Sequence, residues 1–307
     1  MTISAIFADW GTTNRRAWAV DRDGKVLDHR RDEQGLLGVK DRQFEPSFRA
    51  FIGDWPKSAT PGAPIVMAGM VGSKLGWREA PYVKTPCAFS DLASSLTELP
   101  DLDGHPQRIV PGLVCRELGY PDVMRGEEAQ LYGYWLVAKT GRLCVLPGTH
   151  SKWAQVKDGG VSSFRTYMTG ELFAQLIGSG TLAQLMRKDA PHDPAAFKRG
   201  LDAIVDSSAG GLLNLLFSVR ALGLFSELTP EALASYLSGL LIGAELQDVI
   251  GVPPQYAGGA VTVIGSSRMV DLYTTALKSC GASVDPQDGD VLLRAALLEI
   301  ARTAKLM

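Results

Sequence analysis

The chain has 307 residues, of which 46% are hydrophobic and 21% are charged, and its formal net charge is −2. This length is large for one hydrophobic core and sufficient for two. The balanced charge excludes the basic surface typical of proteins that bind nucleic acid or anionic membranes. We therefore expect neither nucleic acid nor a membrane as a partner, whereas the sequence leaves open whether copies form a homo-oligomer.

Targeting and redox signals point to the cytoplasm. The N-terminus enters a strand directly, without the basic and apolar regions of a signal peptide. The four cysteines are scattered without a C-x-x-C pair, which favours reduced thiols over a disulfide framework or a structural zinc site. The most apolar stretch, from Leu212 to Phe225, is short and contains Arg220, so we predict a buried helix rather than a membrane span.

Hydrophobic patterning predicts strands followed by helices in the first half of the chain. The predicted elements are strands at 4–9, 15–20 and 25–31, a helix over 44–55, strands at 65–68 and 108–113, and a helix over 126–138.

The second half begins with another hairpin and is richer in helices. The predicted elements are a hairpin over 142–156, helices over 170–187, 193–205, 207–225 and 230–250, a strand at 261–264, and helices over 266–280 and 289–304. We therefore predict an N-terminal domain at 1–139 and a C-terminal domain at 140–288, with the C-terminal helix 289–307 returning to the first domain.

A related hairpin occurs once in each half. The first turns at Gly11-Thr12-Thr13 and the second at Gly148-Thr149-His150, and each joins two strands with a basic residue and a Trp nearby. Glycine permits a sharp turn and close approach to a ligand, while hydroxyls and exposed backbone N–H groups donate to phosphate oxygens. One such hairpin is an ordinary turn, but the pair predicts two homologous halves that bind a polyphosphate.

The two hairpins differ in one residue that matters for metal binding. Asp9 precedes the first turn, whereas Leu146 and Pro147 stand at the matching place in the second. A carboxylate there is suited to hold Mg²⁺ while the turn contacts the phosphates that the metal bridges. Asp is also a common turn former before Gly, so the metal role is argued from the duplication.

Glu127 and Glu128 stand at the start of the helix that leads to the second hairpin. Acids in a first helical turn are often only complements to the helix dipole. Because this helix begins near the predicted phosphate site, either carboxylate is also a candidate general base for a sugar hydroxyl, with Glu128 preferred.

Further segments supply candidate ligand contacts. The strand-to-helix turn at Gly265-Ser266 is suited to lie against adenosine. The loop after strand 65–68 concentrates Gly, basic and Trp residues, as a substrate loop does, and an acidic substrate requires cations. The candidate substrate contacts are Gly72, Ser73, Lys74, Trp77, Arg78, Arg116 and Arg165, although each cation taken singly is more often a surface residue.

The motifs together resemble a known family. No Walker A, G-x-G-x-x-G or G-x-S-x-G motif occurs. The segments Asp9–Asn14, Gly69–Ser73, Asp122–Glu128, Pro147–Trp153 and Met168–Phe173 instead resemble, in order, the 2-dehydro-3-deoxygalactonokinase family of the actin-like ATPase, sugar kinase and Hsp70 superfamily.

The resemblance implies an α/β fold with two RNase H-like (actin-like ATPase) domains and an interdomain cleft. It implies ATP and Mg²⁺ as cofactors and a small sugar-acid substrate, 2-dehydro-3-deoxy-D-galactonate, phosphorylated at its 6-hydroxyl in galactonate catabolism. Residues 126–129 are similar to the segment that carries the catalytic glutamate of exopolyphosphatases, and this similarity underlies the preference for Glu128. Sugar kinases of this superfamily usually have an Asp as base, and the turn at 265–267 is Gly-Ser-Ser where many relatives have consecutive glycines.

Three alternatives remain open on sequence alone. An exopolyphosphatase-like phosphoanhydride hydrolase, or a kinase of another 2-keto-3-deoxy sugar acid, fits the same phosphate-binding features. A non-catalytic nucleotide switch or sugar sensor is the third hypothesis, and filament formation or capture of a partner protein would identify it.

Overall fold

The computed structural model describes residues 2–205, 210–251 and 259–307, and the chain forms two compact units. Unit 1 comprises Met1–Gly141, Ala154–Arg165 and Asp288–Met307, and unit 2 comprises Arg142–Trp153 and Thr166–Gln287.

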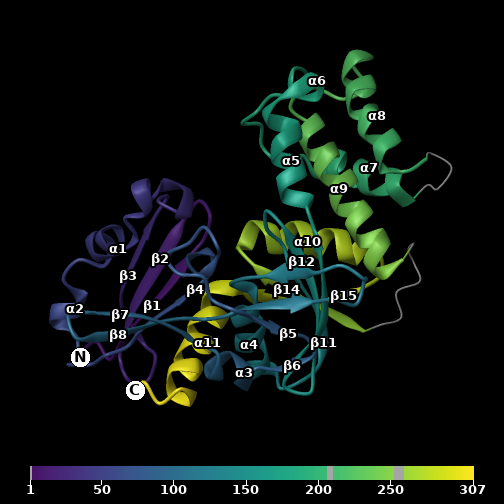
Figure 1. The fold of residues 1–307 in the computed structure, drawn as a ribbon. Helices are drawn as coiled ribbons and strands as arrows, with labels where there is room; N and C mark the ends of the chain where they lie inside the picture. Colours follow the sequence, from purple (N-terminus) through teal and green to yellow (C-terminus); the bar gives the residue numbers. More distant parts are fainter. Residues whose placement is uncertain (1, 206–209, 252–258) are drawn as a thin grey trace. The chain divides into compact units, whose positions relative to one another are not determined.

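Unit 1 is built on a six-stranded sheet of order β3-β2-β1-β4-β8-β7 (Figure 1). Strand β1 pairs antiparallel with β2 and parallel with β4, and β4 pairs parallel with β8. The strands are β1 (Ala5–Trp10), β2 (Arg15–Val20), β3 (Val26–Asp32), β4 (Ile65–Ala68), β7 (Thr97–Leu102) and β8 (His105–Ile109). Strand β4 is buried along its whole length, as a central parallel strand must be.

Helices and a small sheet complete unit 1. The helices are α1 (Phe44–Ile52), α2 (Trp55–Ser58), α3 (Ser90–Ser94), α4 (Glu127–Ala138) and α11 (Gly289–Thr303). The small sheet has the order β10-β9-β5 and consists of β5 (Tyr82–Lys84), β9 (Gly112–Cys115) and β10 (Asp122–Met124). Apolar residues of α1, including Phe48 and Ile52, bury against β1 and β4 residues such as Ile6 and Met67 in one hydrophobic core.

The third sheet repeats the topology of the first. Its order is β15-β14-β11-β12-β13-β6, so β13-β12-β11-β14-β15 matches β3-β2-β1-β4-β8. Its strands are β6 (Cys87–Ala88), β11 (Arg142–Leu146), β12 (Ser151–Lys157), β13 (Gly160–Tyr167), β14 (Ala260–Gly265) and β15 (Ser283–Asp288). As β1 does with β4, β11 pairs parallel with β14. The duplication predicted from the two hairpins is therefore confirmed in the strand order.

The remaining α-helices of the described residues belong to unit 2. They are α5 (Thr169–Gly178), α6 (Gly180–Ala183), α7 (Pro194–Val205), α8 (Leu212–Leu224), α9 (Leu233–Ile250) and α10 (Ser267–Ser279). Figure 1 shows α5 to α9 gathered as a helical group, drawn in teal to green. Within the described residues, α9 alone has the length and apolar composition of a membrane span, but most of its side chains are packed inside unit 2.

Several predicted elements differ from those observed. The strand predicted at 108–113 is two strands, because Pro111 separates β8 from β9. The helix predicted over 170–187 is divided after Gly178, and Gly180 has a φ of 84°. Residues 207–209 of the helix predicted over 207–225 lie outside the described residues.

The prediction that Leu212–Phe225 is a buried helix is wrong for most of its length. Leu215 and Val219 are buried in the helical core, whereas Leu213 is 86% exposed and Phe217 65% exposed. An apolar run is buried on every face only where other elements surround it, and α8 packs on one side alone.

Candidate active site

The first predicted phosphate turn lines a cavity in unit 1. The turn closes where the Gly11 N–H donates to the Asn14 carbonyl at 2.9 Å. The cavity has a volume of about 220 Å³, and its lining includes Asp9, Gly11 and Thr13, together with Arg16. Two of the predicted nucleotide contacts and the predicted metal ligand therefore share one site, and Thr12 is exposed on the same turn.

A segment that the sequence analysis did not single out fixes the orientation of this turn. The N–H groups of Gly35, Leu36 and Leu37 donate to the carbonyls of Thr13, Gly11 and Thr12 at 2.9, 2.9 and 3.2 Å. A Cβ atom at Gly35 would lie 2.4 Å from Thr12 and Thr13 backbone atoms, so only glycine permits this approach. Because these carbonyls are occupied and the Gly11 N–H donates to Asn14, the Thr12 and Thr13 hydroxyls are the polar side-chain groups that the turn offers to a ligand.

Asp9 lies beside Arg16 at the end of β1. The Arg16 Nη2 atom is 2.8 Å from Asp9 Oδ2, and the same guanidinium forms an ion pair with Asp290 at the start of α11. Burial raises the pKa of Asp9 above its ordinary value, and the charges of Asp290 and Glu127 raise it further, while Arg16 opposes the shift. Asp9 is therefore a partly buried carboxyl in a cluster of like charges, partly neutralised by one cation.

The start of α4 lies close behind Asp9. A Cβ atom at Gly69 would lie 2.8 Å from Asp9 Oδ1, and one at Gly126 would lie 3.2 Å from the Gly69 Cα atom. The next residue, Glu127, is half-buried and accepts a hydrogen bond from the Arg125 N–H at 3.0 Å. The structure thus brings Asp9 and Glu127 together at one edge of the unit 1 sheet.

Glu128 differs sharply from its neighbour. Its side chain is 0% exposed, and its Oε2 atom accepts from the Gly126 N–H at 2.7 Å. Among the described residues, its Oε1 atom is buried without a hydrogen-bond partner. Burial raises the pKa of Glu128 to about 8, and the neighbouring Glu127 charge adds to the shift. At neutral pH Glu128 is therefore mostly protonated.

The donor set around Asp9 suits Mg²⁺ in a nucleotide complex. No group of three or more metal-ligating side chains occurs in the parts of the chain that the structure describes. Mg²⁺ in phosphoryl-transfer sites is usually held by one or two carboxylates, with phosphate oxygens and water as its other ligands. Asp9, a carboxylate beside a phosphate-type turn, fits that requirement.

The predicted substrate residues differ in their exposure to solvent. Gly72 and Ser73 are buried, while Lys74, Arg78, Arg116 and Arg165 are exposed. The Trp77 ring lies 6.4 Å from that of Trp10 and 6.0 Å from that of Phe48, so Trp77 also packs on the hydrophobic core.

The second turn lies in unit 2 and is fixed by the start of α5. The Glu171 N–H donates to the Thr149 carbonyl at 2.8 Å, and His150 Nε2 lies 2.5 Å from Glu171 Oε2. A Cβ atom at Gly170 would lie 2.2 Å from the Gly148 carbonyl oxygen. The Gly148-Thr149-His150 turn therefore packs closely against the first helical turn of α5.

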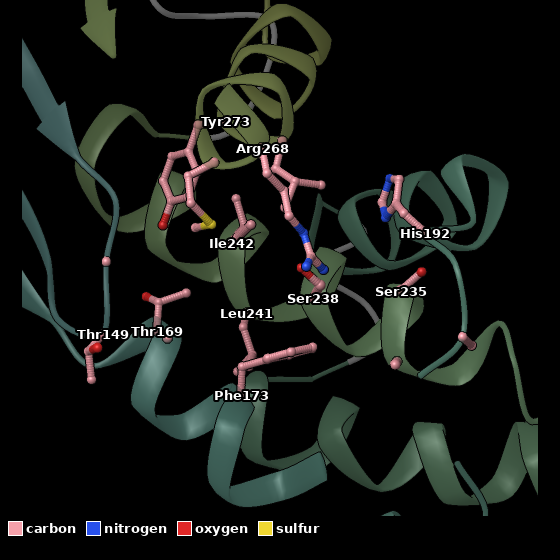
Figure 2. Close-up of a pocket in the computed structure, with 16 residues that line it drawn as sticks. Thr149, Thr169, Phe173, His192, Ser235, Ser238, Leu241, Ile242, Arg268 and Tyr273 are labelled. Carbon is pink, nitrogen blue, oxygen red and sulfur yellow. The ribbon is translucent and has the colours of Figure 1, made fainter. Parts of the chain in front are cut away.

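A cavity of about 420 Å³ opens beside this turn (Figure 2). Its lining residues are Gly148, Thr149, Thr169, Gly170, Phe173, Ala190, His192, Ala234, Ser235, Ser238, Leu241, Ile242, Arg268, Met269, Leu272 and Tyr273. Apolar side chains such as Phe173 and Leu241 form much of the wall, and Arg268 extends its guanidinium toward Ser238. A mostly apolar wall with a few polar groups is typical of a nucleotide or cofactor site.

Gly265 and Ser266 are close in sequence to residues that line this cavity, but they do not line it themselves. They end β14 and precede α10, and Arg268 is the nearest lining residue along the chain. Arg268, Ser235 and Ser238 were not predicted from the sequence, although Arg268 directly follows the Gly-Ser-Ser turn at 265–267.

Glu128→Gln is expected to change the pH dependence of stability. The folded chain retains the Glu128 proton up to about pH 8, whereas an ordinary Glu loses it near 4.5. The folded state therefore binds the extra proton between these values, and the free energy of unfolding contributed by Glu128 falls as pH rises through this window. We expect the Tm of Glu128→Gln to exceed that of wild type at pH 8.5. This difference in Tm should shrink progressively as the pH is lowered to 5, as measured by thermal unfolding. A Tm difference that is the same at both pH values would contradict the assignment.

Comparisons with known proteins identify the family. The 2-keto-3-deoxy-galactonokinase family model matches residues 9–300. The 2-dehydro-3-deoxygalactonokinase of Escherichia coli (strain K12) is 36% identical, and a relative from Rhizobium meliloti (strain 1021) assigned the same activity is 38% identical. Each of these alignments covers 98% of both chains.

Solved structures agree with this result. A crystal structure from Sinorhizobium meliloti, of a protein assigned to the 2-dehydro-3-deoxygalactonokinases, is 36% identical and has a TM-score of 0.87, covering 97% of this chain and 98% of that one. The activator of 2-hydroxyisocaproyl-CoA dehydratase from Clostridium difficile, solved with bound ADPNP, shares the fold at 10% identity, with a TM-score of 0.51 and coverage of 98% and 95%. The predicted α/β actin-like ATPase fold is confirmed. The chain therefore belongs to the 2-keto-3-deoxy-galactonokinase family and is a phosphotransferase that acts on an alcohol group.

Proposed function

We propose that the protein uses ATP to phosphorylate 2-dehydro-3-deoxy-D-galactonate at its 6-hydroxyl, giving 2-dehydro-3-deoxy-6-phosphogalactonate and ADP. The observation that carries the proposal is full-length similarity to a relative named for this activity, at 36% identity. The reaction belongs to galactonate catabolism, and we assign it to the cytoplasm, where ATP is available.

The cavity in unit 2 is the proposed site for the adenosine part of ATP. Its volume of about 420 Å³ and apolar walls suit a purine and a ribose, and Arg268 and Ser238 supply polar contacts. The neighbouring turn residues Gly148, Thr149 and His150, with Gly265 and Ser266, are assigned to this nucleotide. Within unit 1, the turn Gly11-Thr12-Thr13 is assigned to phosphate oxygens of a nucleotide.

Asp9 is the proposed ligand of Mg²⁺. When bound, Mg²⁺ neutralises charge on the phosphate oxygens as the γ-phosphoryl group is transferred. Arg16, which is paired with Asp9 in this structure, contributes a second positive charge at the same turn.

The proposed general base comes from the pair Glu127 and Glu128. As the 6-hydroxyl oxygen forms its bond to the γ-phosphorus and the bond to the ADP oxygen breaks, the carboxylate accepts the hydroxyl proton. Accessibility supports Glu127 as the acceptor, because it is half-buried and its charge acts on Asp9. Glu128, wholly buried with a raised pKa, is suited to hold the start of α4 through the Gly126 N–H.

The sugar acid is assigned to the loop after β4 in unit 1. Gly72, Ser73 and Trp77 are proposed to contact the carbon chain. The carboxylate requires a cation, and the proposed candidates are Lys74, Arg78, Arg116 and Arg165, all of which are exposed.

The first test is a coupled assay of ADP release with purified protein. ADP release should require Mg²⁺ and a 2-keto-3-deoxy sugar acid, with 2-dehydro-3-deoxy-D-galactonate giving the highest kcat/KM in a panel of stereoisomers. Because a kinase requires an alcohol acceptor, phosphate should not be released from ATP or polyphosphate alone. Rapid phosphate release without a sugar acid would refute the proposal.

Asp9→Asn should remove most of the activity. Loss of the carboxylate removes the proposed Mg²⁺ ligand, so kcat should fall by about 100-fold or more. The KM for the sugar acid should change little, because Asp9 is assigned to the metal only. Asp290→Asn is the matched control, because Asp290 also forms an ion pair with Arg16 but lies outside the turn. A kcat within a few fold of wild type for Asp9→Asn would remove the metal role from Asp9.

The two glutamates are distinguished by separate substitutions. Glu127→Gln should lower kcat by about 100-fold with little change in nucleotide affinity, because general base catalysis typically contributes 10² to 10⁴. Glu128→Gln should lower kcat less, since a protonated Glu128 is already neutral and its amide replacement can still accept the Gly126 N–H. The opposite order of the two kcat values would assign the base to Glu128.

A further inference from the structure

Glu245 of α9 is a buried carboxyl group at the centre of a polar cluster in unit 2. It is 3% exposed, and Trp153 Nε1 donates to its Oε1 atom at 2.6 Å. The Tyr273 hydroxyl donates to its Oε2 atom at 2.8 Å, and the Thr169 hydroxyl donates to the same oxygen. Ser151 joins the cluster through Tyr273, with 2.9 Å between the two hydroxyl oxygens.

The partners of Glu245 come from three separate elements that meet at the second turn. Ser151 and Trp153 belong to β12, which leaves the turn Gly148-Thr149-His150, and Thr169 is the first residue of α5. Tyr273 belongs to α10. Figure 2 shows Thr149, Thr169 and Tyr273 along one side of the cavity, and Glu245 therefore joins the elements that make this wall.

The start of α5 transmits the position of Thr169 to the turn. Glu171 donates its N–H to the Thr149 carbonyl, and Gly170 packs against the Gly148 carbonyl oxygen with no room for a Cβ atom. A shift of Thr169 must therefore move Gly148 and Thr149. Because β12 is fixed to the same carboxylate through Trp153, the turn is held both by the strand that leaves it and by the helix packed on it.

We propose that Glu245 is a positioning residue for nucleotide binding, which it serves by fixing the Gly148-Thr149-His150 turn against α5 and α10. The inference rests on the proposed function, in which this turn and cavity bind ATP. Glu245 itself does not line the cavity, so it acts through Thr169, Trp153 and Tyr273.

The direction of the hydrogen bonds favours a carboxylate at this place. The indole N–H of Trp153 is only a donor, so Oε1 must accept it. With Thr169 and Tyr273 donating to Oε2, the Tyr273 proton is occupied, and Ser151 donates to Tyr273. Burial raises the pKa of Glu245, and the donors Thr169, Trp153 and Tyr273 oppose that shift. A residue without an acceptor would leave several buried donors unpaired, and the elements would separate to reach water.

The test compares Glu245→Ala and Tyr273→Phe with wild type. The dissociation constant of a non-hydrolysable ATP analogue is measured by calorimetry, and KM is determined for ATP and for the sugar acid. For Glu245→Ala, we expect the dissociation constant of the analogue and the KM for ATP to rise about tenfold or more, since several buried donors lose their acceptor. For Tyr273→Phe, which removes one buried hydroxyl, a rise of about threefold is expected. The KM for the sugar acid should stay within twofold in both.

Ser218→Ala is the matched control. It removes a hydroxyl hydrogen-bonded to Tyr236 at 2.8 Å within the helices of unit 2, away from the turn. It should lower Tm without changing the affinity for the analogue. If Glu245→Ala does not fold, Tyr273→Phe decides the question, because Phe preserves the ring packing.

The outcomes separate this inference from the proposed function. Wild-type protein that does not bind the analogue overturns the proposed function and this inference with it. Wild-type protein that binds it, with Glu245→Ala or Tyr273→Phe lowering Tm but binding within twofold of wild type, leaves the kinase assignment intact. In that case Glu245 would contribute to stability alone, and the positioning role would be refuted.

Discussion

The close approach of Gly69 to Gly126 is the constraint on which the proposed catalytic end of unit 1 depends. Both residues have positive φ values, 92° and 110°, and a side chain at either position would meet backbone or Asp9. Because the end of β4 and the start of α4 come so close, Glu127 lies near Asp9, and α11 adds Asp290 through Arg16. Carboxylates gathered in this way repel one another and raise the pKa of Asp9. A divalent cation would relieve that repulsion, which is the physical basis for proposing Asp9 as a metal ligand.

The two sheets share a strand order but stabilise their turns by different means. In unit 1 the turn after β1 is held by hydrogen bonds that the backbone N–H groups of residues 35–37 donate to it. The charged residues Asp9 and Arg16 line the adjacent cavity. In unit 2 the corresponding turn is held from behind by neutral donors that converge on Glu245. The two copies therefore share their strand order, whereas the polar groups around their turns differ. One copy carries a metal-type carboxylate at the turn, and the other carries its carboxylate in the interior, where it cannot repel phosphate directly.

Most central elements could be predicted from sequence because their patterns are local. The hairpins, β4, α7, α9 and α11 follow from apolar periodicity and turn residues. The edge strands β7 and β15 were not predicted, and each contains both Pro and Asp, which are rare inside sheets. Such residues are tolerated at sheet edges, and β7 and β15 each end a sheet. Edge position depends on the tertiary fold, so the composition of these segments alone suggests loops.

The candidate site shows the same division between local and tertiary information. Asp9 and the Gly-Thr turns can be recognised from the sequence because a turn and its neighbouring carboxylate are contiguous. The choice between Glu127 and Glu128 cannot be made from the sequence, because adjacent helical residues point about 100° apart and only packing decides which is buried. Helix α9 did carry a readable signal. Ser235, Ser238 and Glu245 recur at intervals of three and seven residues, so they follow one face of a mostly apolar helix. In a core helix each buried polar group needs a partner, so a polar stripe at helical spacing marks the face where that helix meets a cavity or a polar cluster, and in α9 it meets both.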